Sequence, residues 1–301
     1  NRDQAALYGF IDICCNGIKR ERCTFGSVRH GTTTGGRERT VSGTKYRYGC
    51  SLDCELDNCT FGSAAKQNPA TAGVQSSAFC DFHSEAARYI IKNSTFYIPP
   101  FQLGFFIRAR DVTFEGNTFI CSEAGETGQI NAADFTFRKN IIKGGFVLRL
   151  KNYGTQPNVD RCRIIDNEWH DTFGCTIYIE TGTNHEITGN KWYNCGGSQT
   201  ADANQFAPKC LIYIKSLTDG SSKNNISGNH APRYSNDYFV YCSSLDWTQI
   251  ILDGNTGLNT YTRCSMGLAR KRIKIGSIYD PSDTEPTNYT GNVGTTIAAT
   301  P

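Results

Sequence analysis

Hydrophobic and polar residues alternate in many short runs along the chain, and turn-forming residues separate the runs. In "FCDFH" (79–83), Cys80 and Phe82 occupy one phase, whereas Asp81 and His83 occupy the other. A period of two residues indicates a strand with one buried face. No stretch sustains the apolar period of a helix, which is about 3.6 residues. The pattern therefore predicts an all-β chain.

An asparagine followed by apolar or aromatic residues recurs along the sequence, which indicates an internal repeat. Successive spacings between these asparagines are 35, 24, 23, 27, 23, 39 and 26 residues. "ERCTFG" (21–26) resembles "DNCTFG" (57–62), with Arg22 in place of the asparagine, and adds one repeat at the start. The recurrent residues are Asn58, Asn93, Asn117, Asn140, Asn167, Asn190, Asn229 and Asn255.

A repeat of this length holds three short strands with their turns, and the leucine-rich alternative lacks its consensus. We therefore predict a right-handed single-stranded parallel β-helix (β-solenoid) of about nine or ten rungs, each rung being one coil. The recurrent asparagine is expected at a tight turn, where its side chain bonds to the backbone of the next coil.

The long spacings predict ordinary coils with inserted loops, and such loops can wall a groove. The expected insertions are 31–48, 62–78 and 196–209. The β-helix domain is expected over 1–267. The polar segment 268–301 loses the repeat and is expected to cap the helix or to begin a trimerisation tail.

A second strand lies about twelve residues before each asparagine, and its outward phase predicts a column of side chains on one face. Aromatic residues interleaved with charges suit a sugar chain, because aromatic rings stack on pyranoses and charges bind hydroxyls or uronates. The predicted column, with one coil near Asn131 unassigned, contains Asp12, Arg29 or His30, Asp81 with His83, Phe106 with Arg108, Arg149, Tyr178 with Glu180, Tyr213 with Lys215, and Tyr241.

The net charge of +3 gives no indication of a nucleic-acid partner, and no apolar run reaches membrane length. The fourteen cysteines are dispersed and several fall on the apolar phase of strands, so we expect reduced, packed thiols. No zinc-site spacing occurs, and we expect no metal or cofactor. The first residues already read as a strand, so we expect a fragment whose N-terminal region is missing.

"SVRHGTTTGG" (27–36) followed by "SAFCDFHSEAARYIIKNSTF" (77–96) resembles a pattern of pectate-lyase-like β-helices in bacteriophage tailspikes and prophage tail proteins. Gly31 and Cys80 depart from the pattern without changing its polar pair. The resemblance implies a homotrimer on the virion, assembled in the bacterial cytoplasm and joined to other tail proteins through the missing N-terminal region. It also implies binding, and usually cleavage, of a bacterial surface polysaccharide.

The first candidate site combines His30, Asp81 and His83, with Asp81 polarising an imidazole for acid/base catalysis. Alternatively, Asp81 and His83 tie down the inserted loops by hydrogen bonds. Hydrolysis requires two carboxylates, about 6.5–9.5 Å apart for inversion. Asp12, two coils from Asp81, or Glu85, just past the strand, is the expected partner.

The second candidate site contains Arg149, Tyr178, Glu180, Tyr213 and Lys215. Elimination needs a cation that neutralises a uronate and a base at C5, which Arg149, Lys215 and Tyr178 supply. The alternative is an outer salt-bridge ladder that contacts the ligand without chemistry.

Two functional classes remain open at this point. The favoured hypothesis is a tailspike depolymerase of capsule, exopolysaccharide or O-antigen, with glycoside hydrolysis ahead of β-elimination. The other is a receptor-binding spike without cleavage. His30, Arg29, Asp81 and His83 carry the resemblance, whereas the remaining candidates come from strand phase alone.

Overall fold

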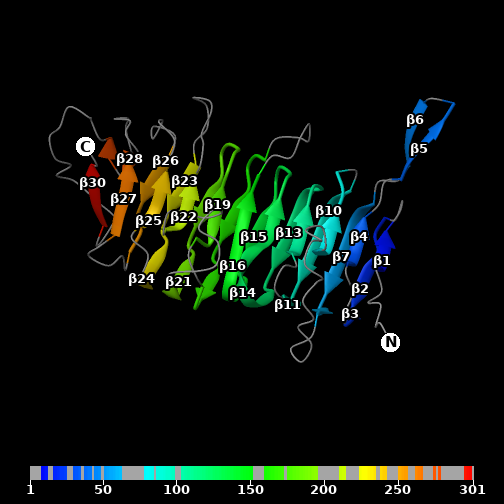
Figure 1. The fold of residues 1–301 in the computed structure, drawn as a ribbon, viewed down its shortest axis with the longest axis horizontal. Coiled ribbons are helices and arrows are strands. Elements are labelled where there is room, and N and C mark those ends of the chain that lie inside the picture. Colours follow the sequence, from blue (N-terminus) through cyan, green and yellow to red (C-terminus); the bar gives the residue numbers. More distant parts are fainter. Residues whose placement is uncertain are drawn as a thin grey trace.

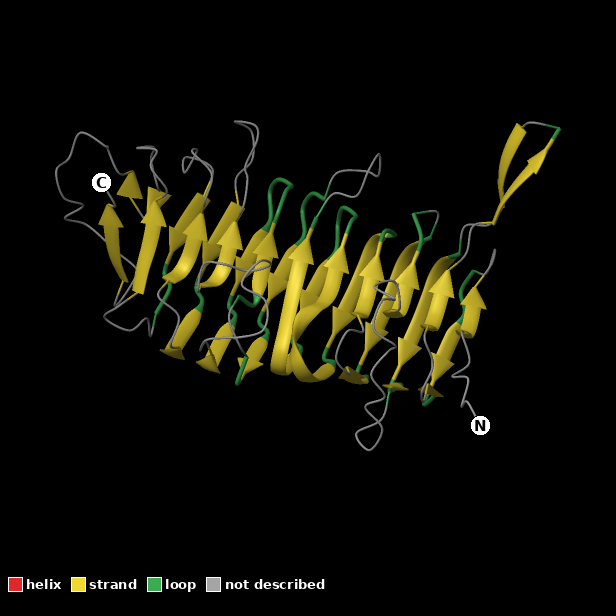
Figure 2. Cartoon of the chain, viewed as in Figure 1, coloured by secondary structure: helices red, strands yellow, loops and turns green. Residues whose placement is uncertain are grey.

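The computed structural model describes most of the central part of the chain and shorter segments at both ends. Within these residues it contains strands and turns and no helix (Figure 2). The described residues are 8–12, 16–25, 30–34, 37–42, 44–48, 51–62, 78–84, 86–98, 103–151, 159–172, 175–195, 210–214, 224–234, 238–242, 250–256, 262–266, 274–275, 277–278 and 295–299.

The strands wind into coils that stack along the long axis of the molecule, with the N-terminus at one end and the C-terminus at the other (Figure 1). Neighbouring coils pair in parallel, which confirms the predicted parallel β-helix. One sheet has 11 strands, of which β29 folds back antiparallel on β28, so the other ten each belong to a separate coil. This number agrees with the repeat count.

The described coils are arranged on three faces. The first face contains β1 (Tyr8–Asp12), β4 (His30–Thr34), β9 (Ala78–Phe82), β12 (Leu103–Ile107), β19 (Ile177–Ile179), β22 (Cys210–Ile214), β25 (Tyr238–Cys242), β27 (Thr262–Met266) and β30 (Thr295–Ala299). The second contains β2 (Lys19–Glu21), β7 (Leu52–Asp57), β10 (Ala87–Lys92), β13 (Arg110–Glu115), β15 (Thr136–Arg138), β17 (Arg163–Ile165), β20 (Glu186–Thr188), β23 (Asn224–Ser227), β26 (Ile250–Asp253), β28 (Lys274–Ile275) and β29 (Ser277–Ile278). The third contains β3 (Thr24–Phe25), β8 (Thr60–Phe61), β11 (Thr95–Ile98), β18 (Glu168–His170), β21 (Lys191–Cys195) and β24 (His230–Tyr234).

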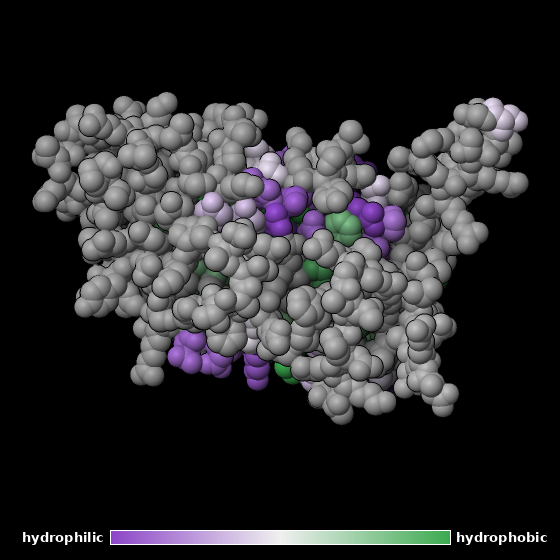
Figure 3. Space-filling view, viewed as in Figure 1, coloured by the Kyte–Doolittle hydropathy of each residue, from purple (hydrophilic) through white to green (hydrophobic). Residues whose placement is uncertain are grey.

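Two long strands, β14 (Thr118–Ile130) and β16 (Ile141–Leu150), run from the third face into the first face of the following coil. They join these two faces into a single sheet of 17 strands. In the view of Figure 3, the described surface is mostly hydrophilic, with a few apolar residues between the polar ones.

The recurrent asparagine forms a buried ladder at the corner between the second and third faces. Asn167 is typical, because its Oδ1 accepts the backbone N–H of Asn140 at 3.0 Å, and its Nδ2 donates to Oδ1 of Asn190 at 2.9 Å. The same bonds connect every recurrent asparagine from Asn117 to Asn255. The predicted asparagine turn is therefore confirmed for these coils, but the side chain bonds to the backbone of the preceding coil and not of the next one.

The residue before each ladder position adopts a left-handed conformation, with φ between +51° and +67° from Arg22 to Gly254. This places Asn58 and Asn93 at the left-handed position, so the ladder positions of their coils are Cys59 and Ser94. The prediction that Asn58 and Asn93 belong to the ladder is therefore wrong by one residue. Asparagine tolerates the left-handed region, which explains why it appears at both positions.

The aromatic residue two positions after the ladder forms the inner stack of the third face. The rings of Phe25, Phe61, Phe96 and Phe119 stack on one another in turn, with centroids 4.4–4.7 Å apart. Trp169 and Trp192 continue the same buried column further along. The repeated motif thus combines a turn residue, a hydrogen-bonding residue and a core aromatic.

The first predicted insertion begins later than expected. His30–Thr34 is β4, a strand of the first face, and the inserted element is the antiparallel hairpin of β5 (Arg37–Val41) and β6 (Thr44–Tyr48). This hairpin projects away from the stacked coils (Figure 1). The insertion at 196–209 and residues 63–77 of the second insertion lie outside the described residues. Parallel pairing continues past 267, because β28 pairs with β26 and β30 with β27.

The nine cysteines whose side chains the structure describes are all free, and eight of them are buried. Cys80, for example, is fully enclosed in the core, and this burial raises the pKa of its thiol. These cysteines serve as small apolar side chains, as the sequence predicts. Among the described residues, no helix has the length and apolarity needed to cross a membrane.

Candidate functional site

The strand register of the first face defines its outward column. Asp81 pairs with Phe106, Phe106 with Gln129, Gln129 with Arg149, and Arg149 with Tyr178. The column continues through Tyr213 to Tyr241. This alignment agrees with the predicted order and supplies Gln129 for the coil that the sequence left unassigned. The side chain of Tyr241 lies outside the described part.

The first two coils do not follow the predicted register. Thr33, three residues after His30, is level with Asp81. Asp12 is level with Thr34 and Phe82, one residue beyond Asp81. Because strand side chains alternate between faces, a shift of one residue reverses the phase. The predicted alignment of His30 and Asp12 with Asp81 is therefore wrong, since β4 begins three residues later than the motif suggested.

Asp81 lies in a polar cluster with His83, which follows the same strand β9, and with Arg108, which follows β12 of the next coil. The Nη2 group of Arg108 donates to Oδ1 of Asp81 at 2.6 Å and lies 2.9 Å from Nε2 of His83. Nε2 of His83 is 3.7 Å from Oδ2 of Asp81. A guanidinium can only donate, so the contact at 2.9 Å fits a neutral imidazole whose Nε2 accepts.

The same cluster includes Phe106 through a cation–π contact. Cζ of Arg108 lies 4.6 Å from the centroid of the Phe106 ring. The side chains of Asp81, Arg108 and His83 are 14%, 22% and 34% exposed, so all three are partly accessible to a ligand. The structure thus brings together four predicted site residues: Asp81, His83, Phe106 and Arg108.

The second cluster lies three to five coils further along the column. Nε and Nη2 of Arg149 both donate to Oε2 of Glu180, at 3.1 and 2.7 Å. Cζ of Arg149 is 5.1 Å from the Tyr178 ring centroid, and the rings of Tyr178 and Tyr213 stack at 4.9 Å. Arg149 and Tyr213 come from the coils before and after Tyr178, so both faces of its ring are covered.

This packing changes the expected role of Tyr178. The residue is only 5% exposed, and it forms a small apolar cluster with Val147, Cys175 and Cys210. Burial, followed by the nearby Glu180 carboxylate, raises the pKa of Tyr178 to about 12. A phenol of this pKa is a poor general base near neutral pH. Tyr178 is therefore better suited to hold Arg149 in position than to stack on a sugar ring or to act as a base.

Several predicted residues cannot be placed. Arg29, Glu85 and Lys215 lie outside the described residues, and only the backbone of His30 and Asp12 is described. Consequently, the predicted ladder Arg149–Glu180–Lys215 is seen only in its first half. Within the described part, no group of three or more His, Cys, Asp and Glu side chains is arranged to hold a metal ion.

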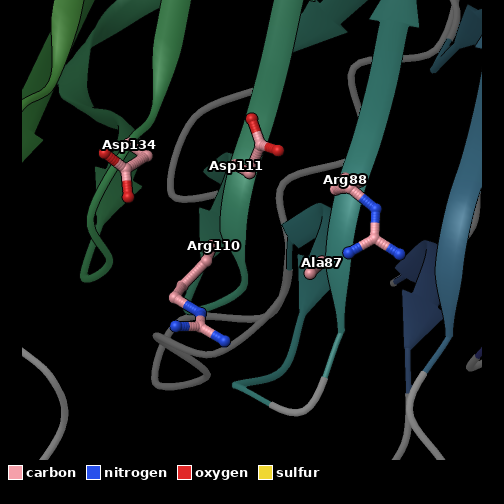
Figure 4. A pocket seen from close by; sticks show the side chains of 5 residues that line it. All are labelled: Ala87, Arg88, Arg110, Asp111 and Asp134. Carbon is pink, nitrogen blue, oxygen red and sulfur yellow. The ribbon is translucent and has the colours of Figure 1, made fainter.

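A shallow depression of about 420 Å³ lies around the corner from Arg108, on the second face. Its lining carries both signs of charge, and Figure 4 shows the side chains on neighbouring strands around an open space. The depression is close to the first cluster along the chain, because its lining residue Arg110 lies two residues after Arg108. The lining residues are Ala87, Arg88, Arg110, Asp111 and Asp134.

A second outward column, on the third face, was not predicted from the sequence. In this column Ile120 pairs with Tyr97 and Lys143, and His170 pairs with Lys143 and Tyr193. The rings of His170 and Tyr193 stack at 5.0 Å. The sequence pattern could have predicted this column, because each of its residues lies three positions after a ladder position.

Comparisons with known proteins identify no relative. No protein-family model, curated protein or solved structure matches the chain.

Proposed function

We propose that the protein binds a polysaccharide along the outward column of the first face, as the tailspike proteins that it resembles bind bacterial surface glycans. The observation that carries this proposal is the in-register series from Asp81 through Phe106, Gln129 and Arg149 to Tyr213. Coils repeat about every 4.8 Å, close to the length of one sugar residue, so successive coils can contact successive sugars.

Charge favours a glycan that carries carboxylates as well as hydroxyls. Arg108 and Arg149 are partly exposed and each already binds one carboxylate, through Asp81 and Glu180. Guanidinium groups retain further N–H donors in a fixed fork that matches carboxylate geometry. An acidic capsule, exopolysaccharide or O-antigen is therefore the expected ligand class.

The binding test is a titration of the protein against purified bacterial glycans. Phe106→Ala and Gln129→Ala should each weaken binding by roughly tenfold, which corresponds to about 1.4 kcal/mol. Lys143→Ala is the matched control, because Lys143 lies in the same coil as Gln129 but on the third face, and it should bind like the parent protein. Equal loss in all three variants, or in none, would contradict the proposal.

Cleavage is a second candidate function, favoured by the first cluster. An imidazole that accepts at Nε2 beside a guanidinium supplies a base and a cation in one place, which β-elimination of a uronate requires. The nearest described column carboxylate to Asp81 is Glu180, four coils away, or roughly 19 Å at about 4.8 Å per coil. That distance exceeds the 5–9.5 Å or so that hydrolysis needs. The predicted carboxylate partners, Glu85 and Asp12, have no described side chain, so hydrolysis stays the alternative to elimination that analysis of the products tests.

His83→Gln tests the cleavage proposal. If His83 is the base, formation of unsaturated, ultraviolet-absorbing products should fall at least ~10²-fold while glycan binding is retained. Asp81→Asn should lower thermal stability and orient Arg108 less well, because a charge-assisted hydrogen bond is lost. New reducing ends without unsaturation would favour hydrolysis instead, and binding without any shortening of the glycan would leave only the receptor-binding spike.

Assembly completes the proposal. By resemblance, we propose a homotrimer attached to other phage tail proteins on the virion. Light scattering of the intact protein tests the trimer, and a monomer at micromolar concentration would count against it.

A further inference from the structure

Cys23 and Cys59 occupy the ladder position in the first two described coils. Thr24 pairs with Thr60 in the strands that follow them, and the backbone N–H of Thr60 donates to the carbonyl of Cys23 at 2.9 Å. The two cysteines are therefore level on adjacent coils, about 4.8 Å apart. This spacing lies within the Cα separation of about 4.4–6.8 Å that disulfides adopt.

The Cys59 thiol points toward the first coil. Its Sγ lies 3.8 Å from the carbonyl oxygen of Arg20, three residues before Cys23. In later coils, the asparagine Nδ2 bonds to the carbonyl at this same position, as Asn140 does to Phe114. Burial is the main cause that raises the pKa of the Cys59 thiol, and the neighbouring Cys23 thiol raises it further. Two thiols thus replace two amides of the ladder.

The two thiols differ in their access to solvent. Cys59 is buried, whereas Cys23 is only partly covered. A reagent in solution can therefore reach Cys23 first, and Cys59 can then react only with a group already attached to Cys23.

We propose that Cys23 and Cys59 form a disulfide when the folded protein meets a small disulfide oxidant such as oxidised glutathione. The Cys23 thiolate attacks one glutathione sulfur, forming a mixed disulfide and releasing one glutathione thiolate. The Cys59 thiolate then attacks the Cys23 sulfur, and the second glutathione leaves. Two cysteine thiols are oxidised, one glutathione disulfide is reduced to two thiols, and two protons pass from the cysteines to the products.

The bond would close the segment between the first two coils, which carries the β5–β6 hairpin. It would therefore clamp the base of this projecting element to the β-helix when the protein moves from a reducing to an oxidising medium.

Cys175 and Cys210 provide an internal comparison. They also occupy level positions on adjacent coils, because Ile177 pairs with Ile212 two residues further on. Both are buried, with no more than 1% of either residue exposed. They share the register of the proposed pair but lack its access to solvent, so they should remain thiols in the folded protein.

The test is a peptide map of the intact, folded protein after incubation with oxidised glutathione. Free thiols are alkylated in denaturant, and digestion and mass spectrometry follow without reductant. We expect a linked peptide pair containing Cys23 and Cys59, and alkylated Cys175 and Cys210. In Cys59→Ser, Cys23 should instead retain glutathione, and in Cys23→Ser, Cys59 should be alkylated.

The outcomes are unambiguous provided that circular dichroism shows the β-sheet content of the parent in both variants. Alkylated Cys23 and Cys59 in the treated parent protein would overturn the proposal. So would a stable glutathione adduct on Cys23 beside an alkylated Cys59, or a bond from Cys23 to a second molecule.

Discussion

The chain turns through a left-handed residue at several corners of its coils, and two of these corners are filled by different side chains. At the corner between the second and third faces, the residue after the turn is the buried ladder asparagine in every coil from Asn117 to Asn255. At the corner before the second face, φ is between +52° and +61° from Asp53 to Asn184. There the next residue is buried as well, but it varies: Cys54, Tyr89, Val112, Phe135, Cys162 and His185.

A left-handed turn can therefore recur from coil to coil whether or not the side chain that follows it is repeated. A left-handed turn fixes the backbone and directs the following side chain inward, but it does not dictate that side chain. At the second corner, the ladder reappears only late, where Nδ1 of His185 accepts from the Cys162 N–H and Oδ1 of Asn224 accepts from the His185 N–H. The two corners therefore share a shape and differ in their hydrogen bonds.

Breaking the asparagine corner should have the largest effect. Asn167→Ala removes four side-chain hydrogen bonds and leaves the Asn140 N–H and the Phe137 carbonyl buried without that partner. Because each such group costs about 1–3 kcal/mol, we expect a loss of about 4 kcal/mol in the free energy of unfolding. Urea denaturation measures this. Asn225→Ser, on the outward side of β23, is the control and should change stability by less than about 0.5 kcal/mol.

The second corner should be sensitive to acid. Burial lowers the pKa of His185 to about 4 from its ordinary 6.5, although contacts with the Thr181 carbonyl and Asp160 oppose this. The unfolded chain therefore binds the proton first, so stability falls as the pH drops from 6.5 toward 4 and is unaffected above 6.5. The loss is about 3 kcal/mol in total.

His185→Asn sharpens this prediction, because Oδ1 of asparagine can replace Nδ1 as the acceptor without titrating. Thermal unfolding between pH 7 and 5 should then depend less on pH than in the parent protein. An unchanged pH dependence would mean that other groups cause it.

The left-handed position should give the smallest effect, in the opposite direction. Lys139 has φ +54°, whereas four coils have glycine at the equivalent position. A left-handed conformation costs a non-glycine residue about 1–2 kcal/mol, so Lys139→Gly should raise the free energy of unfolding by about 1 kcal/mol. Gly189→Ala is the matched reversal and should destabilise, because its Cβ would overlap the Asp166 carboxylate. Both changes are read from chemical denaturation.

The fold could be predicted from the sequence because the same residue type, asparagine, recurs at the corner between the second and third faces. Asparagine is conspicuous at a spacing of 23–27 residues, and the aromatic residue two positions later marks the core. The other corner was invisible, since Asp53, Arg88 and Asn184 share a backbone angle but no side-chain type. The same ambiguity caused the error at Asn58 and Asn93, where asparagine occupies the turn position and a cysteine or serine occupies the ladder.

For the candidate site, the sequence could predict only which side chains of a strand point outward, because they alternate with inward ones. Alternation placed Asp81, Phe106, Arg149, Tyr178 and Tyr213 in one column, and the register agrees. Alternation gives no information on contacts between neighbouring coils. Only the structure shows that both faces of the Tyr178 ring are covered. The same is true of the contacts of Arg108 with Asp81 and His83.

The asparagine ladder also has a direction. From Ser94 onward, each N–H donor of a ladder residue points to an Oδ1 acceptor in the next coil toward the C-terminus, and the order never reverses as far as Asn255. The side-chain amides are thus aligned dipoles, and each bond polarises the next one in the row. The Ser94 end of the row therefore presents oxygen acceptors and the Asn255 end presents amide donors, so the column is electrically polar along the axis even though its residues carry no charge.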